Sequence, residues 1–148
     1  RLEASRRVGD LGTGTWEQVL ATLALEDYDA ILASRGRLLA AGHRTLTTAL
    51  RERLPEWRFS AAAGGVSVWA DLGEPSGTRV SRAAAARGLT LPPGSRFGSP
   101  GVFERFLRLP FTAPQAELTQ AVHILEQAWA GRSRASSGLG VELDTPVI

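Results

Sequence analysis

The sequence of 148 residues contains no cysteine. Disulfide bonds, zinc–thiolate sites and thiol nucleophiles are therefore all excluded for this chain. Lysine is absent as well, so all 17 residues in the combined lysine and arginine count are arginine. Without a lysine side chain, the chain cannot supply the amine of a catalytic Schiff base.

Long apolar runs are also missing. No stretch approaches the roughly 18–20 residues that a membrane-spanning helix needs, and the first ten residues, RLEASRRVGD, lack the apolar centre of a signal peptide. We therefore expect a cytoplasmic chain that does not contact a membrane. The net charge is only +2, with 43% hydrophobic and 22% charged residues. This composition is typical of a globular domain with a real core and does not indicate a nucleic-acid-binding surface.

Apolar periodicity predicts three main helices. The stretch WEQVLATLAL follows Thr15, a candidate N-cap, and a long helix is expected over residues 26–54, closed by Pro55 and weakened at Gly36 and Gly42. The last helix is expected to open at Thr112, which forms a capping-box pattern with Gln115. It should end at Gly131, so residues 1–131 are expected to form one domain and residues 132–148 a flexible tail.

Strand-like segments lie between these helices. EWRFS (56–60) and VSVWADL (66–72) flank a turn-rich stretch and predict a hairpin, and two further strands are expected in LTLPP (89–93) and over residues 103–111. A short helix from about Thr78 to Arg87, ended by Gly88, is expected between them. The order of these elements predicts an α+β fold, in which a small, mostly antiparallel sheet is covered by helices on one face.

Catalytic patterns are scarce in the sequence. His43 and His123 are far apart with no metal-ligand spacing, and Asp71 and Glu74 flank a glycine in a pattern typical of a turn. No G-x-S-x-G elbow and no Walker or dinucleotide-binding glycine motif occurs. The four tryptophans lie on separate elements, and we expect them to pack in the core rather than to form a ligand cage.

Arg108 is the one charged residue placed unusually. It stands between two leucines in the run FERFLRLPF, residues 103–111. Strand alternation puts it on the opposite side from the apolar set, which comprises Leu107, Leu109 and Phe111 with Arg105, and on the same side as Phe106 and Pro110. Its guanidinium could belong to the solvated face of an edge strand, or it could bind a carboxylate through two parallel hydrogen bonds.

The motifs around Arg108 resemble a known family. PGSRFG (93–98) followed by FLRLPF (106–111) resembles the C-terminal small domain of class I/II aminotransferases, which are pyridoxal-phosphate-dependent proteins of fold type I. AAGGVSVWADL (62–72) and APQAELTQAVHILEQAW (113–129) match the same domain in the same order. VGDLGTGTWEQ (8–18), with the pair GGVSVW and RLPF, is most similar to the aminotransferase-like half of MocR-type transcription regulators of the GntR group.

The resemblance implies roles for individual residues. It implies that Arg108 binds the α-carboxylate of an amino-acid substrate or effector, and that Ser95, Phe97 and Gly98 shape the mouth of the ligand site. It also implies pyridoxal phosphate as the cofactor of the whole protein. Because the chain has no lysine, we expect no cofactor and no catalytic residue on this piece alone, and we expect no metal.

Two functions are compatible with the resemblance. The first is a fragment of a regulator whose small domain closes over the cofactor site when it binds an amino-acid or related carboxylate ligand; such a protein would contact DNA only through an N-terminal domain that is missing here. The alternative is the small domain of a genuine aminotransferase. In either case the resemblance implies a full-length homodimer.

Overall fold

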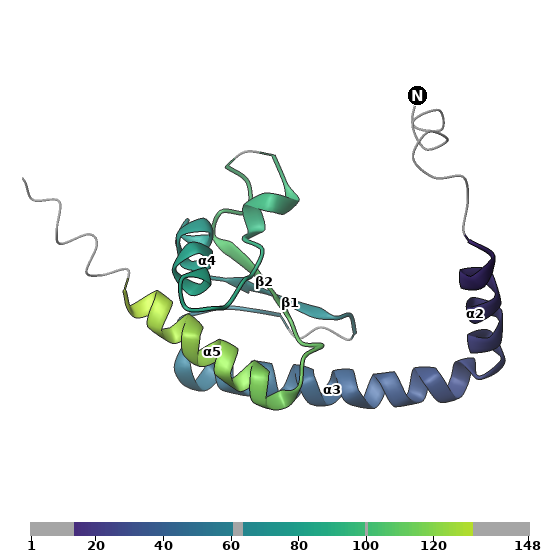
Figure 1. Ribbon diagram of the computed structural model, residues 1–148. Helices are drawn as coiled ribbons and strands as arrows, with labels where there is room; N and C mark the ends of the chain where they lie inside the picture. The colour runs from purple at the N-terminus through teal and green to yellow at the C-terminus, as the bar shows by residue number, and fades with distance from the viewer. Residues whose placement is uncertain (1–13, 61–63, 100, 132–148) are drawn as a thin grey trace, which may run out of the picture. The chain divides into compact units, whose positions relative to one another are not determined.

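The structure is a computed structural model and describes residues 14–60, 64–99 and 101–131. The predicted tail, residues 132–148, lies outside the described residues. The chain divides into two compact units, residues 1–38 and 39–148, with the boundary inside the long helix α3 (Tyr28–Arg53). We describe the two units separately (Figure 1).

Helix α2 (Thr15–Glu26) and the first part of α3 form the described portion of the first unit. Helix α2 begins where the sequence predicts, but Gly14 rather than Thr15 occupies the N-cap, without a side-chain cap. Helix α3 agrees closely with the predicted 26–54 helix and continues through both Gly36 and Gly42. None of the α2 residues is buried, and Trp16 is 79% exposed. The expectation that Trp16 packs in the core is therefore wrong.

The second unit contains a two-stranded antiparallel sheet made of β1 (Ser67–Asp71) and β2 (Phe106–Pro110). In this register Trp69 lies opposite Arg108, and Val68 lies opposite Leu109. The predicted hairpin is wrong, because residues 56–60 pair with β1 only at Arg58, which bridges to Asp71. The neighbouring Trp57 is drawn into the core, so burial of this large ring prevails over continued strand pairing.

The predicted strand at residues 89–93 also reduces to one bridge, between Pro93 and Leu107. The backbone N–H of Arg108 donates to the carbonyl of Pro92 at 3.4 Å, so residues 92–93 run along the edge of β2 opposite to β1. Proline at both positions removes the backbone donors that a longer ladder would need. As a result, β2 is flanked on both edges rather than being a free edge strand.

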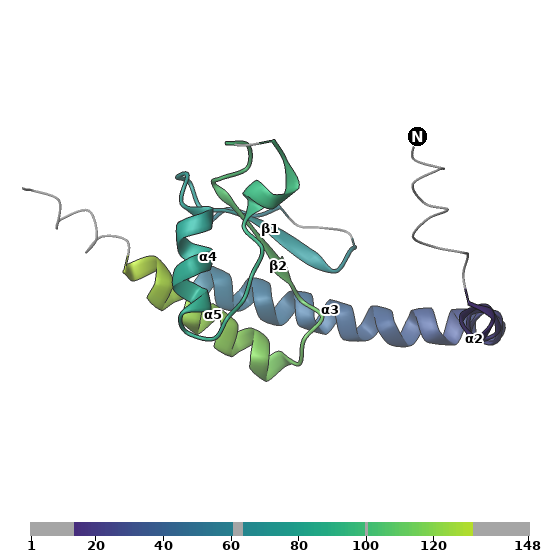
Figure 2. The same cartoon turned by 45° about the horizontal axis from the view of Figure 1, so that its top comes forward.

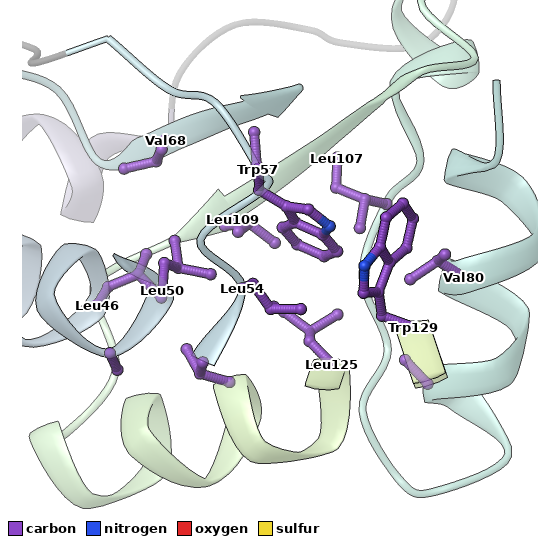
Figure 3. Packing of buried hydrophobic residues seen from close by; sticks show 14 of the residues in the cluster. Leu46, Leu50, Leu54, Trp57, Val68, Val80, Leu107, Leu109, Leu125 and Trp129 are labelled. Carbon is purple, nitrogen blue, oxygen red and sulfur yellow. The ribbon is translucent and has the colours of Figure 1, made fainter. Parts of the chain in front are cut away.

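One face of the sheet packs on helices α3 and α5 (Gln115–Ala130), as Figures 1 and 2 show. Leu50 from α3 and Leu54, which directly follows this helix, meet Leu107 from β2 and Leu125 from α5 in a single buried cluster (Figure 3). Helix α4 (Gly77–Ala85) closes one end of this cluster with Val80 and Ala84. The predicted fold class, a small antiparallel sheet with helices on one face, is confirmed.

Two tryptophans complete the core as predicted. The rings of Trp57 and Trp129 meet edge to face, with centroids 5.4 Å apart (Figure 3). Both side chains are 4% exposed. The indole N–H of Trp129 donates to the carboxylate of Glu56, which satisfies the polar end of a ring whose body is buried.

Helices α3 and α5 lie close together and run in the same direction. Gly42 approaches Leu118 near the start of α5, whereas Arg53 forms an ion pair with Glu126 at 2.8 Å further along both helices. A Cβ atom at Gly42 would collide with the backbone carbonyl of Phe111. Glycine at this helical position therefore permits the close approach of α3 to the segment that joins β2 to α5.

The ends of α4 and α5 differ in part from the prediction. Helix α4 ends at Ala85, and Gly88 follows with φ +87°, a conformation that glycine adopts without cost. Helix α5 begins at Gln115 after Pro114, and the predicted capping box between Thr112 and Gln115 is absent. Pro114 is extended, with ψ 147°, and carries the chain into the helix without a side-chain cap.

Within the described ranges, no helix is long and apolar enough to cross a membrane.

Candidate functional site

Arg108 lies on the face of the sheet opposite to the one that packs on α3 and α5. Its neighbours along β2, Leu107 and Leu109, are 0% and 2% exposed on the core side, whereas Arg108 itself is half-buried on the other side. The predicted alternation along β2 is therefore confirmed. The exception is Arg105, which precedes β2 and is exposed instead of sharing the buried face with the leucines.

The Arg108 guanidinium has an aromatic neighbour but no acidic one. Its Cζ atom lies 5.7 Å from the centroid of the Phe97 ring, within the range of a cation–π contact. Among the residues that the structure describes, no carboxylate forms an ion pair with Arg108. A half-buried cation on a rigid strand thus keeps the hydrogen-bond donors that an external carboxylate would use.

Trp69 stands directly opposite Arg108 on β1, and cross-strand partners in an antiparallel sheet share a face. The indole is 40% exposed, so the expectation that Trp69 packs in the core is wrong. It instead contacts three phenylalanine rings, with centroids 5.4 Å from Phe97, 5.8 Å from Phe103 and 5.9 Å from Phe106. Trp69, Phe97, Phe103 and Phe106 together form what we call the aromatic wall.

The predicted mouth residues lie in and after the short 3-10 helix η1 (Gly94–Phe97), on the side of the sheet away from α3 and α5 (Figures 1 and 2). Phe97 belongs to the aromatic wall and is 46% exposed. Gly98 makes room for another member of the wall, because a Cβ atom there would come within 2.8 Å of the Phe103 ring. The Ser95 hydroxyl, in contrast, is 3.1 Å from the hydroxyl of Thr78 at the start of α4.

Glu104 anchors this region, although it belongs to no motif of the sequence that points to a site. Its carboxylate accepts hydrogen bonds from the backbone N–H and the hydroxyl of Thr78, both at 3.0 Å. These bonds place a negative charge at the N-terminus of α4, where the helix dipole favours it. The hydrogen bond from the Thr78 hydroxyl lowers the pKa of the Glu104 carboxyl below its ordinary value. Burial opposes this shift, and the hydrogen bonds from the Thr78 N–H and from Ser95 assist it.

A sequence signal for Glu104 exists but is weak. Helix α4 has no acidic residue in its own first turn, which leaves its N-terminal N–H groups for an acceptor from elsewhere. Local sequence gives no means of choosing a glutamate that lies so far along the chain.

The second arginine near the site is already paired. Arg105 donates from Nε and Nη2 to the two carboxylate oxygens of Asp71, each at 2.7 Å. The backbone N–H of Gly73 also donates to Asp71, as expected for a turn. Burial opposes ionisation of Asp71, but the bonds from Arg105 and Gly73 prevail and lower the pKa of this carboxyl below its ordinary value. Arg105 is therefore engaged within the fold, unlike Arg108.

Other candidate chemistry lies away from Arg108. His43 packs edge to face on Phe111, and His123 contacts Glu126 and Gln127 on α5. No group of three or more metal-ligating side chains occurs in the part of the chain that the structure describes. A shallow groove of about 390 Å³ runs between Gly88–Leu89 and α5, and none of the predicted site residues lines it.

Comparison with solved structures identifies the class of fold. The α-aminoadipate aminotransferase LysN of Thermus thermophilus, in complex with N-(5'-phosphopyridoxyl)-L-leucine, matches 89% of this chain at 24% identity with a TM-score of 0.78. N-succinyldiaminopimelate aminotransferase of Mycobacterium tuberculosis matches 84% at 25% identity with a TM-score of 0.71. An aspartate transaminase of Corynebacterium glutamicum matches 67% at 23% identity with a TM-score of 0.59.

These matches show that the chain has the fold of a part of pyridoxal-phosphate-dependent aminotransferases. The chain spans 35%, 33% and 25% of the three solved proteins, so it corresponds to about a third or less of each. No protein-family profile matches the sequence, and no curated protein matches it.

The residues of this chain do not fit pyridoxal phosphate as a covalently held group. No lysine is present to form an imine with the cofactor aldehyde. Backbone N–H groups at the N-terminus of a helix often bind phosphate. In α4 the N–H of Thr78 already donates to the Glu104 carboxylate. We therefore assign no cofactor contact to these residues.

Proposed function

We propose that the chain is the small domain of a pyridoxal-phosphate-dependent aminotransferase and that Arg108 binds the carboxylate of the amino-acid substrate. The observation that carries the proposal is the half-buried Arg108 guanidinium, which has no carboxylate partner among the described residues. The aminotransferase fold supports it. In this proposal the cofactor is held by parts of the protein outside this chain.

The chemistry of the contact follows from the guanidinium itself. Its planar donor fork matches a carboxylate, and a bidentate pair fixes both the position and the orientation of the bound acid. Because β2 is flanked on both edges, the Arg108 backbone moves little when a ligand arrives. In this proposal Arg108 acts as a binding and orienting residue.

The test uses the complete protein that contains this chain. Wild type should transfer an amino group from an amino acid to a 2-oxo acid, and Arg108→Ala should lose about 2–5 kcal/mol of substrate binding. This loss corresponds to a rise in KM of about thirtyfold or more. Bound pyridoxal phosphate, followed by its absorbance, should remain. Arg51→Ala is a matched control, since Arg51 also lies over a phenylalanine ring, that of Phe59. An unchanged KM in Arg108→Ala would contradict the assignment.

The regulator is the second candidate, supported by the similarity of VGDLGTGTWEQ and of the pair GGVSVW and RLPF to MocR-type proteins. The solved structures described above are enzymes by name, which favours the aminotransferase. The two candidates differ in what precedes this segment in the complete protein. The regulator would be favoured by a winged-helix segment, by amino-acid-dependent DNA binding and by the absence of amino-group transfer. In that case Arg108→Ala should abolish the effect of the amino acid on DNA binding.

A further inference from the structure

The aromatic wall is more exposed than a core cluster would be. Trp69, Phe97 and Phe103 are 40%, 46% and 44% exposed although each contacts another ring of the wall. Contiguous exposed rings are uncommon on soluble domains, and they often mark a surface that binds a ligand. Here the rings lie beside the guanidinium of Arg108.

The wall is held in place at a conformational cost. Phe103 has φ +60°, a left-handed conformation that costs an L-residue about 1–2 kcal/mol. Gly98 accommodates the Phe103 ring by having no side chain. The hydrogen bonds to Thr78 tie Ser95, which precedes Phe97, and Glu104, which follows Phe103, to α4. A surface arranged in this way is preorganised, so little ordering entropy is lost when a ligand binds.

The neighbouring charges decide which ligand fits. Arg105 is neutralised by Asp71, whereas Arg108 has no acidic partner among the described residues. One cation beside several rings matches a molecule with one carboxylate and one apolar group. We propose that the carboxylate ligand of Arg108 carries an apolar, preferentially aromatic, substituent that lies against Phe97 and Trp69; this inference rests on the proposed function.

A ligand with a second carboxylate is the competing possibility. It would need another cation, and Arg96, an exposed residue of η1 next to Phe97, is the candidate. The experiment therefore compares ligands that differ in one group at a time: 3-phenylpropionate, butyrate, 3-phenylpropanol and glutarate.

Binding of each compound is measured by calorimetric titration into the complete protein that contains this chain. We expect 3-phenylpropionate to bind about tenfold more tightly than butyrate, the gain expected from contact between aromatic rings. 3-Phenylpropanol should bind more weakly than 3-phenylpropionate because it lacks the carboxylate. Phe97→Ala should remove the advantage of the ring, and Arg108→Ala the advantage of the carboxylate.

The matched controls come from a second cation–π pair in the same unit. Arg51 lies over Phe59 with Cζ 5.3 Å from the ring centroid, so Phe59→Ala and Arg51→Ala should leave all four affinities unchanged. Equal binding of 3-phenylpropionate and butyrate, or tighter binding of glutarate, would overturn the inference and leave the Arg108 contact standing. Failure of both butyrate and 3-phenylpropionate to bind would overturn the proposed function together with it.

Discussion

The two faces of the β1–β2 sheet arise from alternate residues of the same short strands, yet they are built for different purposes. On one face Val68, Ala70 and Leu107 are at most 3% exposed and join a single apolar cluster. On the other, Trp69 and Arg108 lie opposite one another and remain partly accessible. The first face contributes stability by removing apolar surface from water, whereas the second retains an accessible ring and cation.

The two faces of the sheet are also kept ordered by different contacts. The face that carries Trp69 and Arg108, here called the open face, lies away from α3 and α5, and its order comes from the backbone of β2 and from the hydrogen bonds around Glu104. The buried face therefore supports the open one. Changes on the core side should affect folding, and changes on the open side should affect ligand binding.

The largest expected effect distinguishes neighbouring residues on opposite faces. Leu107→Ala should lower the free energy of unfolding by about 2–5 kcal/mol, because a fully buried leucine leaves a cavity. Arg108→Ala should change it by no more than about 1 kcal/mol, since a half-exposed cation–π contact contributes little. Urea unfolding of both variants measures the difference. Equal losses in the free energy of unfolding would mean that both faces contribute to stability alike.

A second test examines how closely the core side is packed. Gly42→Ala should destabilise the chain by about 1–3 kcal/mol, because the new methyl group meets the Phe111 carbonyl and the Leu118 side chain. Gly36→Ala in the same helix is the control. A Cβ atom at Gly36 has no neighbour within 4 Å, so this variant should gain up to about 1 kcal/mol from better helix propensity. Thermal unfolding of both variants should therefore shift in opposite directions.

The smallest effect concerns the order of the open face and depends on pH. The folded-state pKa values of Glu104 and Asp71 lie below their ordinary values of 4.5 and 3.8. The unfolded chain therefore binds more protons in acid, and the contribution to stability is present above the ordinary values and lost as pH falls through the lower folded ones. Glu104→Gln should lower stability at pH 7 and reduce its loss between pH 7 and pH 3.

Thr78→Val gives an independent check of the same hydrogen bonds. It removes the hydroxyl donor to Glu104 but keeps the backbone donor, so it should reproduce part of the Glu104→Gln effect. Denaturant unfolding at several pH values measures both variants. Identical pH dependence in wild type and Glu104→Gln would show that the Glu104 carboxylate does not order the open face.

Much of the fold was predictable because it depends on local periodicity. The α3 helix, the alternation around Arg108 and the break after α5 at Gly131 follow from residues close together in the chain. The errors concern partners that lie far apart. The predicted hairpin paired residues 56–60 with β1 along their length, whereas only Arg58 pairs there and β2 forms the ladder with β1. Trp57 is buried against Trp129 instead of continuing a strand.

The candidate site divides in the same way. Arg108 was recognisable from its position between two leucines and from the motifs around it, while the role of Ser95 at the ligand mouth stays a prediction, since its hydroxyl contacts Thr78. The site roles of Trp69 and Glu104 were not predicted. Trp69 belongs to the site only because the fold places it opposite Arg108, and Glu104 only because the fold brings it to Thr78.

By itself, the sequence determined which side chains alternate along each strand and which chemistry is impossible on this chain. No arrangement can supply a thiol or a lysine amine where neither residue exists. The tertiary structure alone decided that Trp69 stands opposite Arg108, that Arg105 is neutralised by Asp71, and that Glu104 ties the loop to α4. Periodicity is a property of neighbouring residues, whereas these contacts join distant segments and form only when burial of the common core brings those segments together.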